Sequence, residues 1–317
     1  MKLISIVTPC YNEEENVEEL HARINAVMSE FPKYKYEHIL IDNASTDQTI
    51  TILRKLAKED KTVKVIINTR NYGHIRSPYY ALLQAKGDAV IGMASDLQDP
   101  PEMICQFISK WEEGYKVVMG VKTKSEESGL MFGLRKLYYR TLRSLSDIDL
   151  VENFTGYGLY DRKIIEILRK MNDPYPYFRG MIADIGFPTA KIEFTQPKRA
   201  RGITKNNFYT LFDMAMLGLT SYSKVPLRMA TMFGFLVAAV SFLIGLFYLV
   251  YKLLNWQNFS VGAAPIVVGL FFFGAIQLMF LGIVGEYIGA IYTQVLHRPL
   301  VIEKERINFD DEPDIIE

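Results

Sequence analysis

Four short polar segments could do chemistry, and each directly follows a run of apolar residues. They span residues 9–13, 42–47, 70–74 and 95–99. Asp42 and Asp96 each end or follow such a run, so their carboxylates are expected at the rim of a sheet. There they could accept hydrogen bonds from a base or ribose, or bind a cation; for Asp42 the alternative is a cap on the next helix. Asp47 and Asp99 are interpreted as cap or turn residues.

The loop around Asp96 could hold a divalent metal ion. Mg²⁺ keeps several water ligands and needs only one or two carboxylates together with phosphate oxygens. Asp96 fits that role, and the side-chain amide oxygen of Gln98 could be a second ligand. Taken together, the four polar segments suit a sugar nucleotide.

Alternating strands and helices must position these segments. Five β-rich runs predict strands at 3–8, 38–42, 63–67, 89–93 and 116–121. Helical patterns follow the first four, at 16–29, 49–57, 77–85 and 101–113. This alternation is typical of an α/β domain with a mostly parallel sheet, in which ligands bind beyond the carboxyl ends of the strands. The polar segments are therefore expected to meet at one edge.

Two long uncharged stretches, 229–251 and 263–285, follow this region. A helix that crosses the hydrocarbon core needs about 20 apolar residues, so both qualify as spans; the alternative is a pair of buried core helices. The short connector predicts a hairpin. Basic residues flank its outer ends, whereas Lys252 alone lies between the stretches. By the positive-inside rule, a multi-pass protein of the cytoplasmic membrane is predicted, with the N-terminal domain and both termini in the cytosol.

Composition narrows the classes of partner. The 36 basic and 36 acidic residues cancel, so no global field draws the chain to nucleic acid, and membrane lipids are the expected surroundings. Cys10 and Cys105 predict unpaired thiols rather than a zinc site. Apolar residues at helical spacing between Phe208 and Tyr222 predict a helix that lies in the membrane interface or packs on the α/β domain. Glu286 is interpreted as an interfacial contact or a contact within a homo-oligomer.

Residues 5–14, 41–47, 70–74 and 96–102 form four ordered motifs that resemble family 2 glycosyltransferases. More narrowly, they resemble the polyprenyl-phosphate glycosyltransferases, the branch that includes dolichol-phosphate mannose synthases and bacterial undecaprenyl-phosphate glucosyltransferases. The resemblance extends through 178–180, 199–205, the two apolar stretches and 285–287, and so covers nearly the whole chain.

The resemblance implies a GT-A fold, a divalent metal ion (Mg²⁺ or Mn²⁺), a nucleotide-sugar donor and a polyprenyl phosphate acceptor. It implies that the donor contacts residues of the motifs, namely Pro9, Tyr11, Glu13, Asp42, Arg70, Ser95 and Asp96. It implies that cations hold the acceptor phosphate, namely Arg179, Arg199 and Lys205. An ordinary positive membrane flank that attracts anionic lipids is the alternative for these cations. Asp96, Arg199 and Lys205 are the predicted catalytic residues, with Asp96 and Gln98 on the metal.

Two segments depart from the family pattern. The metal loop usually carries two acids, and Ala94 stands where the first would be. Gly156 and Gly158 stand where the family usually has an acid and an arginine. The predicted function is inverting transfer of a hexose, with UDP-glucose or another UDP-hexose as donor, to undecaprenyl phosphate. The alternative is a catalytically silent membrane subunit that binds a nucleotide sugar.

These predictions divide the chain into four parts. Residues 1–205 would form the GT-A domain, 206–226 an amphipathic interfacial helix, and 227–296 the two transmembrane helices. Residues 297–317 would form a cytosolic tail whose acidic end is disordered.

Overall fold

The computed structural model describes residues 1–123, 150–197, 216–254 and 263–310. In this part of the chain, eight strands form one sheet in the order β7-β5-β6-β4-β1-β2-β3-β8. The first four strands in the chain are parallel to one another, and β5 is parallel to β7. In contrast, β6 is antiparallel to β4 and β5, and β8 is antiparallel to β3. The strands are β1 (Lys2–Cys10), β2 (Tyr34–Asp42), β3 (Val63–Asn68), β4 (Ala89–Gly92), β5 (Val117–Lys122), β6 (Phe154–Asp161), β7 (Thr189–Phe194) and β8 (Glu303–Ile307).

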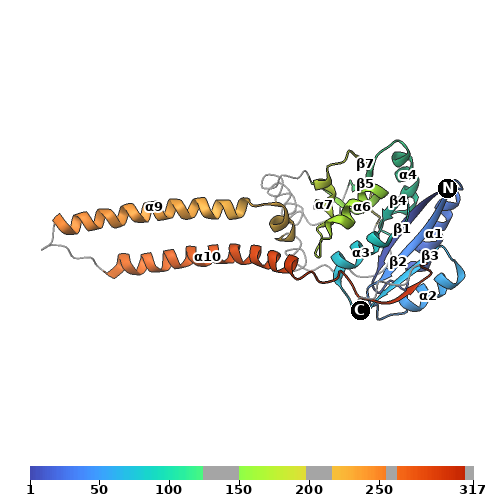
Figure 1. Ribbon diagram of the computed structural model, residues 1–317, viewed down its shortest axis with the longest axis horizontal. Helices are drawn as coiled ribbons and strands as arrows, with labels where there is room; N and C mark the ends of the chain where they lie inside the picture. Colours follow the sequence, from blue (N-terminus) through green and yellow to red (C-terminus); the bar gives the residue numbers. More distant parts are fainter. Residues whose placement is uncertain (124–149, 198–215, 255–262, 311–317) are drawn as a thin grey trace.

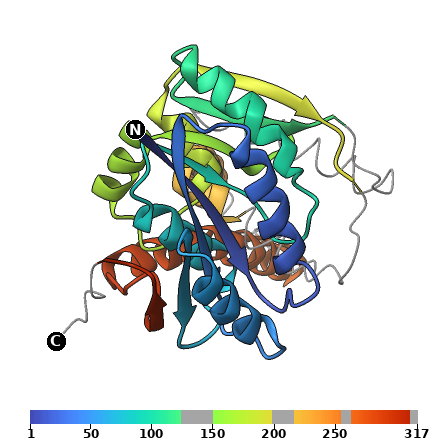
Figure 2. The same ribbon diagram turned by 90° about the vertical axis from the view of Figure 1, so that its right-hand side faces the viewer.

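Helices cover both faces of the sheet (Figure 2). They are α1 (Val17–Ser29), α2 (Thr49–Glu59), α3 (Gly73–Gln84), the 3₁₀ turn η1 (Pro101–Met103), α4 (Ile104–Glu112), α6 (Arg162–Met171) and α7 (Phe178–Ile185). One face packs against α1, α2 and α4, and the opposite face packs against α3, α6 and α7. Because the central strands are buried on both faces, they read in the sequence as continuous apolar runs.

The five predicted strands and four predicted helices are all present, with bounds that differ by a few residues. Three strands were not predicted: β6, β7 and β8. In β6, Gly158 pairs with Gly92 of β4 and Met119 of β5. A Cβ atom at Gly158 would lie 2.3 Å from the carbonyl oxygen of Val118, so only glycine allows β6 to approach β5 this closely.

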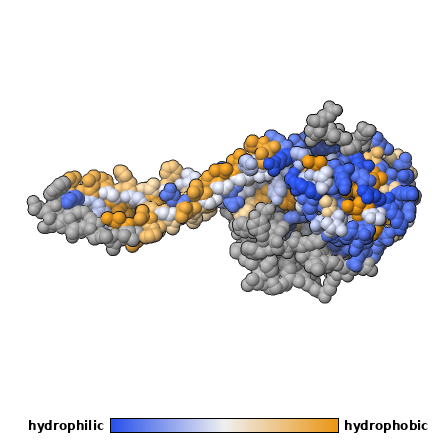
Figure 3. Space-filling model, turned by 90° about the horizontal axis from the view of Figure 1, so that it is seen from below, coloured by the Kyte–Doolittle hydropathy of each residue, from blue (hydrophilic) through white to orange (hydrophobic). Residues whose placement is uncertain are grey.

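Two long helices, α9 (Val225–Leu254) and α10 (Ala263–Val295), project side by side from one end of the α/β domain (Figure 1). Both are long and apolar enough to cross a membrane, and none of their most apolar 18-residue windows is buried. Figure 3 shows apolar surface along the pair and polar surface over much of the domain. This exposure argues against buried core helices and favours the predicted hairpin.

The chain returns from α10 to the sheet, where β8 pairs with the edge strand β3. Four of the five residues of β8 are charged. Glu305 forms an ion pair with Arg54 of α2, and Glu303 forms one with Arg306 at 2.7 Å. Glu303 also accepts a hydrogen bond from the hydroxyl of Tyr80 at 2.9 Å. Residues after α10 therefore complete the domain that residues before α9 begin. The acidic end, 311–317, lies outside the described residues.

A short helical segment, 216–222, leads into α9 and packs against the α/β domain. The rings of Tyr222 and Tyr177 lie 6.0 Å apart between centroids. A Cβ atom at Gly180 would come within 2.5 Å of the Tyr222 ring, so α7 and this segment are in close contact. This segment, the end of the predicted apolar stripe, therefore packs on the domain. Residues 206–215 lie outside the described part of the chain.

Candidate active site

A cavity of about 420 Å³ opens beyond the carboxyl ends of β1 and β4, between α3 and α7. It is lined by polar residues of the predicted metal loop (Asp96, Gln98, Asp99), by Pro9 near the end of β1, and by His74, Lys122, Gly156 and Arg179 from other elements. Aromatic and apolar groups of α3 and α7 complete its wall, among them Tyr79 and Phe178. Parallel strands bring their carboxyl ends to one edge, which is why segments far apart in the chain meet there.

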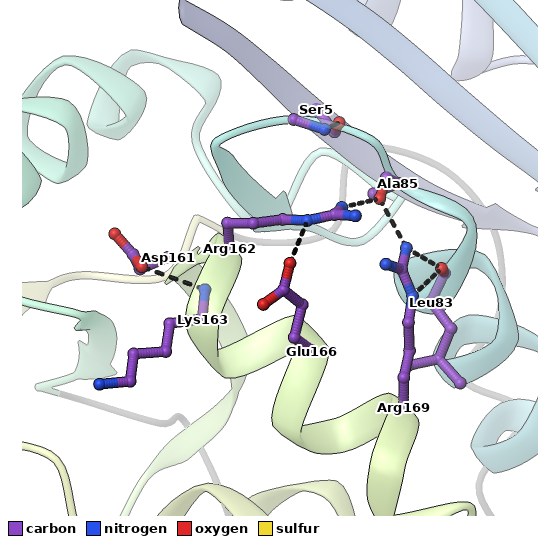
Figure 4. Close-up of polar contacts among 9 residues, drawn as sticks. Ser5, Leu83, Ala85, Asp161, Arg162, Lys163, Glu166 and Arg169 are labelled. Atoms are coloured by element: carbon purple, nitrogen blue, oxygen red, sulfur yellow. Dashed lines mark hydrogen bonds and ion pairs between the residues drawn. The ribbon is translucent and has the colours of Figure 1, made fainter.

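Helix α3 forms part of the cavity wall, and two arginines of α6 donate hydrogen bonds to its C-terminal end (Figure 4). Arg169 donates from Nε to the carbonyl oxygen of Leu83 at 2.8 Å and from Nη2 to that of Ala85 at 2.9 Å. Arg162 donates to the same Ala85 oxygen at 2.7 Å. Carbonyl groups in the last turn of a helix lack partners within the helix, and cations are favourable there. These two arginines therefore hold the end of α3 whose first half lines the cavity.

The metal loop is a tight turn built around its own carboxylates. Leu97 has a φ of 59°, in the left-handed region, and Oδ1 of Asp96 accepts a hydrogen bond from the Gln98 amide at 3.2 Å. Oδ2 of Asp99 accepts from the amide of Ala94 at 3.0 Å and closes the loop. Gln98 donates from Nε2 to the carbonyl oxygen of Pro197 at 3.3 Å. The predicted metal residues Asp96 and Gln98 thus lie together in the cavity.

Asp99 was predicted to be only a turn residue, but it also lies in the cavity wall. Burial, together with the nearby charge of Asp96, raises the pKa of its carboxyl group to about 6, against the opposing effects of the Ala94 amide and Lys122. Two signals in the sequence could have placed Asp99 and Lys122 at the cavity. Asp99 is three residues beyond Asp96 on the same loop, and Lys122 is the last residue of β5, at the same edge of the sheet.

The oxygen atoms of this loop fit a hard divalent cation. Two carboxylates, Asp96 and Asp99, and one amide oxygen, Gln98, line a single cavity. Mg²⁺ and Mn²⁺ accept such ligands when substrate phosphates supply the rest. No cluster of three or more His, Cys, Asp or Glu side chains suited to a metal occurs in the described residues, so phosphate and water ligands would be needed.

Asp42, predicted to contact a base or ribose, is fully buried at the end of β2. Its Oδ2 accepts a hydrogen bond from the Ser45 amide at 2.9 Å, and its Oδ1 accepts one from the Ser45 hydroxyl. Burial raises the pKa of Asp42, and the Ser45 hydrogen bonds oppose this shift. Asp47, predicted to cap α2, accepts from the amide of its first residue, Thr49, at 3.0 Å, whereas the N-cap position itself is held by Gln48.

Only one of the other predicted donor contacts in the described residues lines the cavity. Pro9 lines it, whereas Tyr11, Glu13, Ser95 and Arg70 do not. Glu13 lies in a loop joined to α2, because its amide donates to Thr49 Oγ1 at 2.9 Å and its carboxylate accepts from Asn16 at 2.7 Å. Ser95 is buried beside Asp96. Arg70 is exposed and stacks on Tyr72, 4.0 Å from the ring centroid.

Of the three cations predicted to bind the acceptor phosphate, Arg179 is described. It lines the cavity from α7 and donates from Nη1 to the carbonyl oxygen of Phe154 at 3.3 Å. Arg199 and Lys205 lie outside the described residues.

Comparisons with known proteins agree with this geometry. The sequence model for "Glycosyl transferase family 2" matches residues 5–168, and the model "GtrB C-terminal hairpin" matches residues 225–291. The chain belongs to glycosyl transferase family 2. It is 34% identical to the "Uncharacterized glycosyltransferase YkcC" of Bacillus subtilis over 97% of this chain and 95% of that one. It is 33% identical to the "Bactoprenol glucosyl transferase" of Shigella phage SfV over 95% of this chain and 98% of that one.

Among solved structures, mannosyl-3-phosphoglycerate synthase from Rubrobacter xylanophilus is similar over 68% of this chain and 71% of that one. The identity is 18% and the TM-score 0.46.

The two departures from the family pattern both border the cavity of this family 2 glycosyltransferase. Ala94 and Gly156 line it, and Gly156 has a φ of 102°, a conformation that residues with side chains rarely adopt. Because the missing acids would have stood at this wall, Asp96 and Asp99 are the carboxylates that remain in the described cavity.

Proposed function

We propose that this glycosyltransferase moves a sugar from a UDP-sugar to a polyprenyl phosphate at the cytosolic face of the cytoplasmic membrane. Support for the acceptor comes from the name of the phage relative, which acts on bactoprenol, and from the match of residues 225–291 to a C-terminal hairpin model. UDP-glucose and undecaprenyl phosphate are the proposed substrates.

One observation carries the proposal: the wall of the polar cavity is continuous with the helices that could span a membrane. Tyr177 lines the cavity and contacts Tyr222, and the helical segment that contains Tyr222 leads into α9. From the other side, Tyr287 of α10 donates to the carbonyl oxygen of Ser223 at 2.6 Å. A reactive phosphate on a lipid held at the membrane surface would therefore lie next to a cavity suited to a diphosphate donor.

The proposed reaction is a displacement at the anomeric carbon. An oxygen of the acceptor phosphate forms a bond to that carbon while the bond to the donor diphosphate breaks, and the nucleoside diphosphate leaves with the bonding electrons. A phosphate monoester has a second pKa near about 6, so its oxygen is already anionic at neutral pH and needs no strong base. Attack from the side opposite the leaving group inverts the configuration.

The residues of this chain would supply alignment and charge balance. Asp96, with Gln98 and Asp99, would hold a divalent cation, which when bound neutralises charge on the leaving diphosphate. Arg179 would face the phosphates from α7. Arg199 and Lys205 remain proposed phosphate contacts from the sequence.

The test is product formation by the purified full-length protein with radiolabelled UDP-glucose and undecaprenyl phosphate. Lipid-linked label that requires Mg²⁺ or Mn²⁺, with an inverted anomeric centre, is expected. A donor screen that follows nucleotide release in the presence of the lipid would identify another sugar. If no donor gives lipid-linked product while nucleotide sugars still bind, the silent-subunit alternative is correct instead.

A further inference from the structure

Arg70 and Arg76 lie beside the segment that follows α10, which contains Arg298. The guanidinium carbon of Arg70 lies 4.0 Å from the ring centroid of Tyr72, and that of Arg76 lies 5.4 Å from the same centroid. Arg76 also donates from Nη2 to the carbonyl oxygen of Pro299, which directly follows Arg298. Two guanidinium groups thus lie near one aromatic ring, and Arg298 is close enough for its charge to act on Arg76.

The charge of this arginine cluster is unbalanced within the part of the chain that the structure describes. Burial lowers the pKa of Arg76, and the like charges of Arg70 and Arg298 lower it further. The Nε atom of Arg76 is buried and has no hydrogen-bond partner among the described residues. Buried donors are almost always paired in native proteins, and charges of one sign repel unless an anion lies between them. Both features would be resolved by a bound anion.

Phosphate is the anion that suits the cluster best. Guanidinium groups donate paired, parallel hydrogen bonds that match two phosphate oxygens, and stacking on an aromatic ring holds such a group in a fixed orientation. Tyr72 is buried, so the ring under Arg70 and Arg76 is itself held by the domain.

The position of the cluster indicates where the phosphate would come from. The second apolar helix ends at Val295, three residues before Arg298, and Ile302 accepts a hydrogen bond from the Thr69 amide at 3.0 Å as the chain rejoins the sheet. The cluster therefore lies where an apolar helix gives way to the polar domain, at the depth of lipid headgroups. His74, two residues before Arg76 on α3, lines the cavity.

We propose that Arg70, Arg76 and Arg298 bind the phosphate group of a membrane lipid beside the entrance to the active site. The inference rests on the proposed function only in that α9 and α10 span a bilayer. The shared chemistry is a phosphate at the membrane surface, carried either by polyprenyl phosphate as a monoester or by an anionic phospholipid as a diester. For Arg70, this role replaces the donor contact that the family resemblance implied.

Diffuse attraction of anionic lipids to a positive flank is the competing explanation, and Arg228 provides a matched control. It is an exposed arginine in the first turn of α9, at the same end of the helix pair, with the same charge. Diffuse attraction depends on charge alone, so R228Q and R298Q would then weaken lipid binding equally. If the site depends on the paired hydrogen bonds of a guanidinium group, R76K should also weaken lipid binding, although lysine keeps the charge.

The experiment measures lipid binding rather than turnover. Full-length protein in neutral detergent is titrated with undecaprenyl phosphate, phosphatidylglycerol, phosphatidylcholine or inorganic phosphate, and bound lipid is followed by native mass spectrometry. R76Q and R298Q should weaken binding of the lipid that occupies the site by about tenfold or more, R76K by about fivefold, and R228Q by less than about twofold. Melting temperatures show whether each variant is folded. If R76Q unfolds, the test rests on lipid binding by R298Q, a substitution that removes no hydrogen bond or ion pair in the described part of the chain.

Each outcome has one meaning. Selective loss of undecaprenyl phosphate binding identifies the acceptor as the source of the phosphate, and selective loss of phosphatidylglycerol binding identifies a phospholipid. Equal effects of R298Q and R228Q overturn the proposal, as does a raised donor KM in R70Q with unchanged lipid binding. Absence of sugar transfer by a wild-type protein that still binds lipid through the cluster refutes the proposed function and leaves this site intact.

Discussion

Asp96 is the residue on which the proposed chemistry depends most, because Ala94 occupies the position of a second acid on its loop. We expect Asp96→Asn to lower kcat at least about tenfold while the protein stays folded, since loss of a metal ligand removes stabilisation of the leaving diphosphate. The measurement is metal-dependent transfer by purified variants with matched melting temperatures. Asp184→Asn, an exposed change on α7, is the control and should be neutral. Activity of Asp96→Asn near that of wild type would remove Asp96 from the metal site.

Asp99 gives the same loop a dependence on pH. Its pKa is raised from 3.8 to about 6, chiefly by burial, so the folded state favours the neutral acid. The stability that this preference contributes is complete below about pH 4 and is lost as the pH rises through about 6, on the order of 3 kcal/mol. Relative to Asp99→Asn, the melting temperature of wild type should fall between about pH 4 and 6 and stay level above about 7. If the melting temperatures of the two proteins changed with pH in the same way, Asp99 would not be the source of the pH dependence.

At the residue scale, the sequence was sufficient to place polar residues that directly follow a buried strand. Asp96 and Gln98 could be assigned to the cavity because strand ends converge. The double role of Asp99 was missed, since a residue before proline reads as a turn, although its place three residues beyond Asp96 was a signal that it could also border the cavity. The hydrogen bonds of Asp42 with Ser45 were likewise invisible, because they depend on how the loop closes on itself.

At the element scale, α6 should act as a clamp on α3. Arg169 donates to two carbonyl oxygens at the C-terminal end of α3, those of Leu83 and Ala85. Hydrogen bonds from a charged donor contribute about 1.5–3 kcal/mol each, so Arg169→Ala should destabilise the protein by about 2 kcal/mol or more. Lys170→Ala, an exposed change on the same helix, should stay within about 0.5 kcal/mol. Chemical unfolding measures both, and equal effects would show that the clamp does not stabilise the fold.

Elements divide into those that local pattern predicts and those that only distant contacts create. The first four strands are apolar runs followed by amphipathic helices, so their pattern is local. In contrast, β6 contains Gly156 and Gly158 and reads as a loop, yet it is buried between β4 and β5. Likewise, β8 consists almost entirely of charged residues and reads as a polar tail. Its strand form depends on pairing with β3, more than 230 residues earlier in the chain, which no local pattern encodes.

At the scale of the whole molecule, β8 links the two apolar helices to the catalytic domain at a second point. The first link is the segment 216–222 before α9, and the second is the return from α10 to the sheet edge. Gln294 of α10 adds a contact by donating to Asp173 at 2.9 Å. Because the N-terminal end of α9 and the C-terminal end of α10 are both attached to the domain, the cavity has a defined position relative to the helix pair. Such positioning matters for a reaction whose acceptor is held in the bilayer.

The attachment through β8 can be tested by shortening the chain from its C-terminal end. Ending it at Pro299 would remove β8 and expose the hydrogen-bonding edge of β3, which favours aggregation. We expect that variant to melt at a lower temperature and to aggregate in detergent, whereas a chain that ends at Asp310 keeps every described contact of β8 and should behave as wild type.

Asn308 allows the same link to be weakened without truncation. It has a φ of 62° and donates from Nδ2 to the carbonyl oxygens of Ala57 at 2.6 Å and Val63 at 2.8 Å. Asn308→Ala loses both hydrogen bonds and the side chain that best tolerates this conformation, so it should destabilise the protein by about 2 kcal/mol. Asn308→Gly loses the hydrogen bonds alone and should be milder. If transfer to lipid falls in Asn308→Ala at a temperature where the domain remains folded, while donor binding is unchanged, β8 positions the cavity for its acceptor. Donor binding and transfer that fall together would instead show that β8 only stabilises the domain.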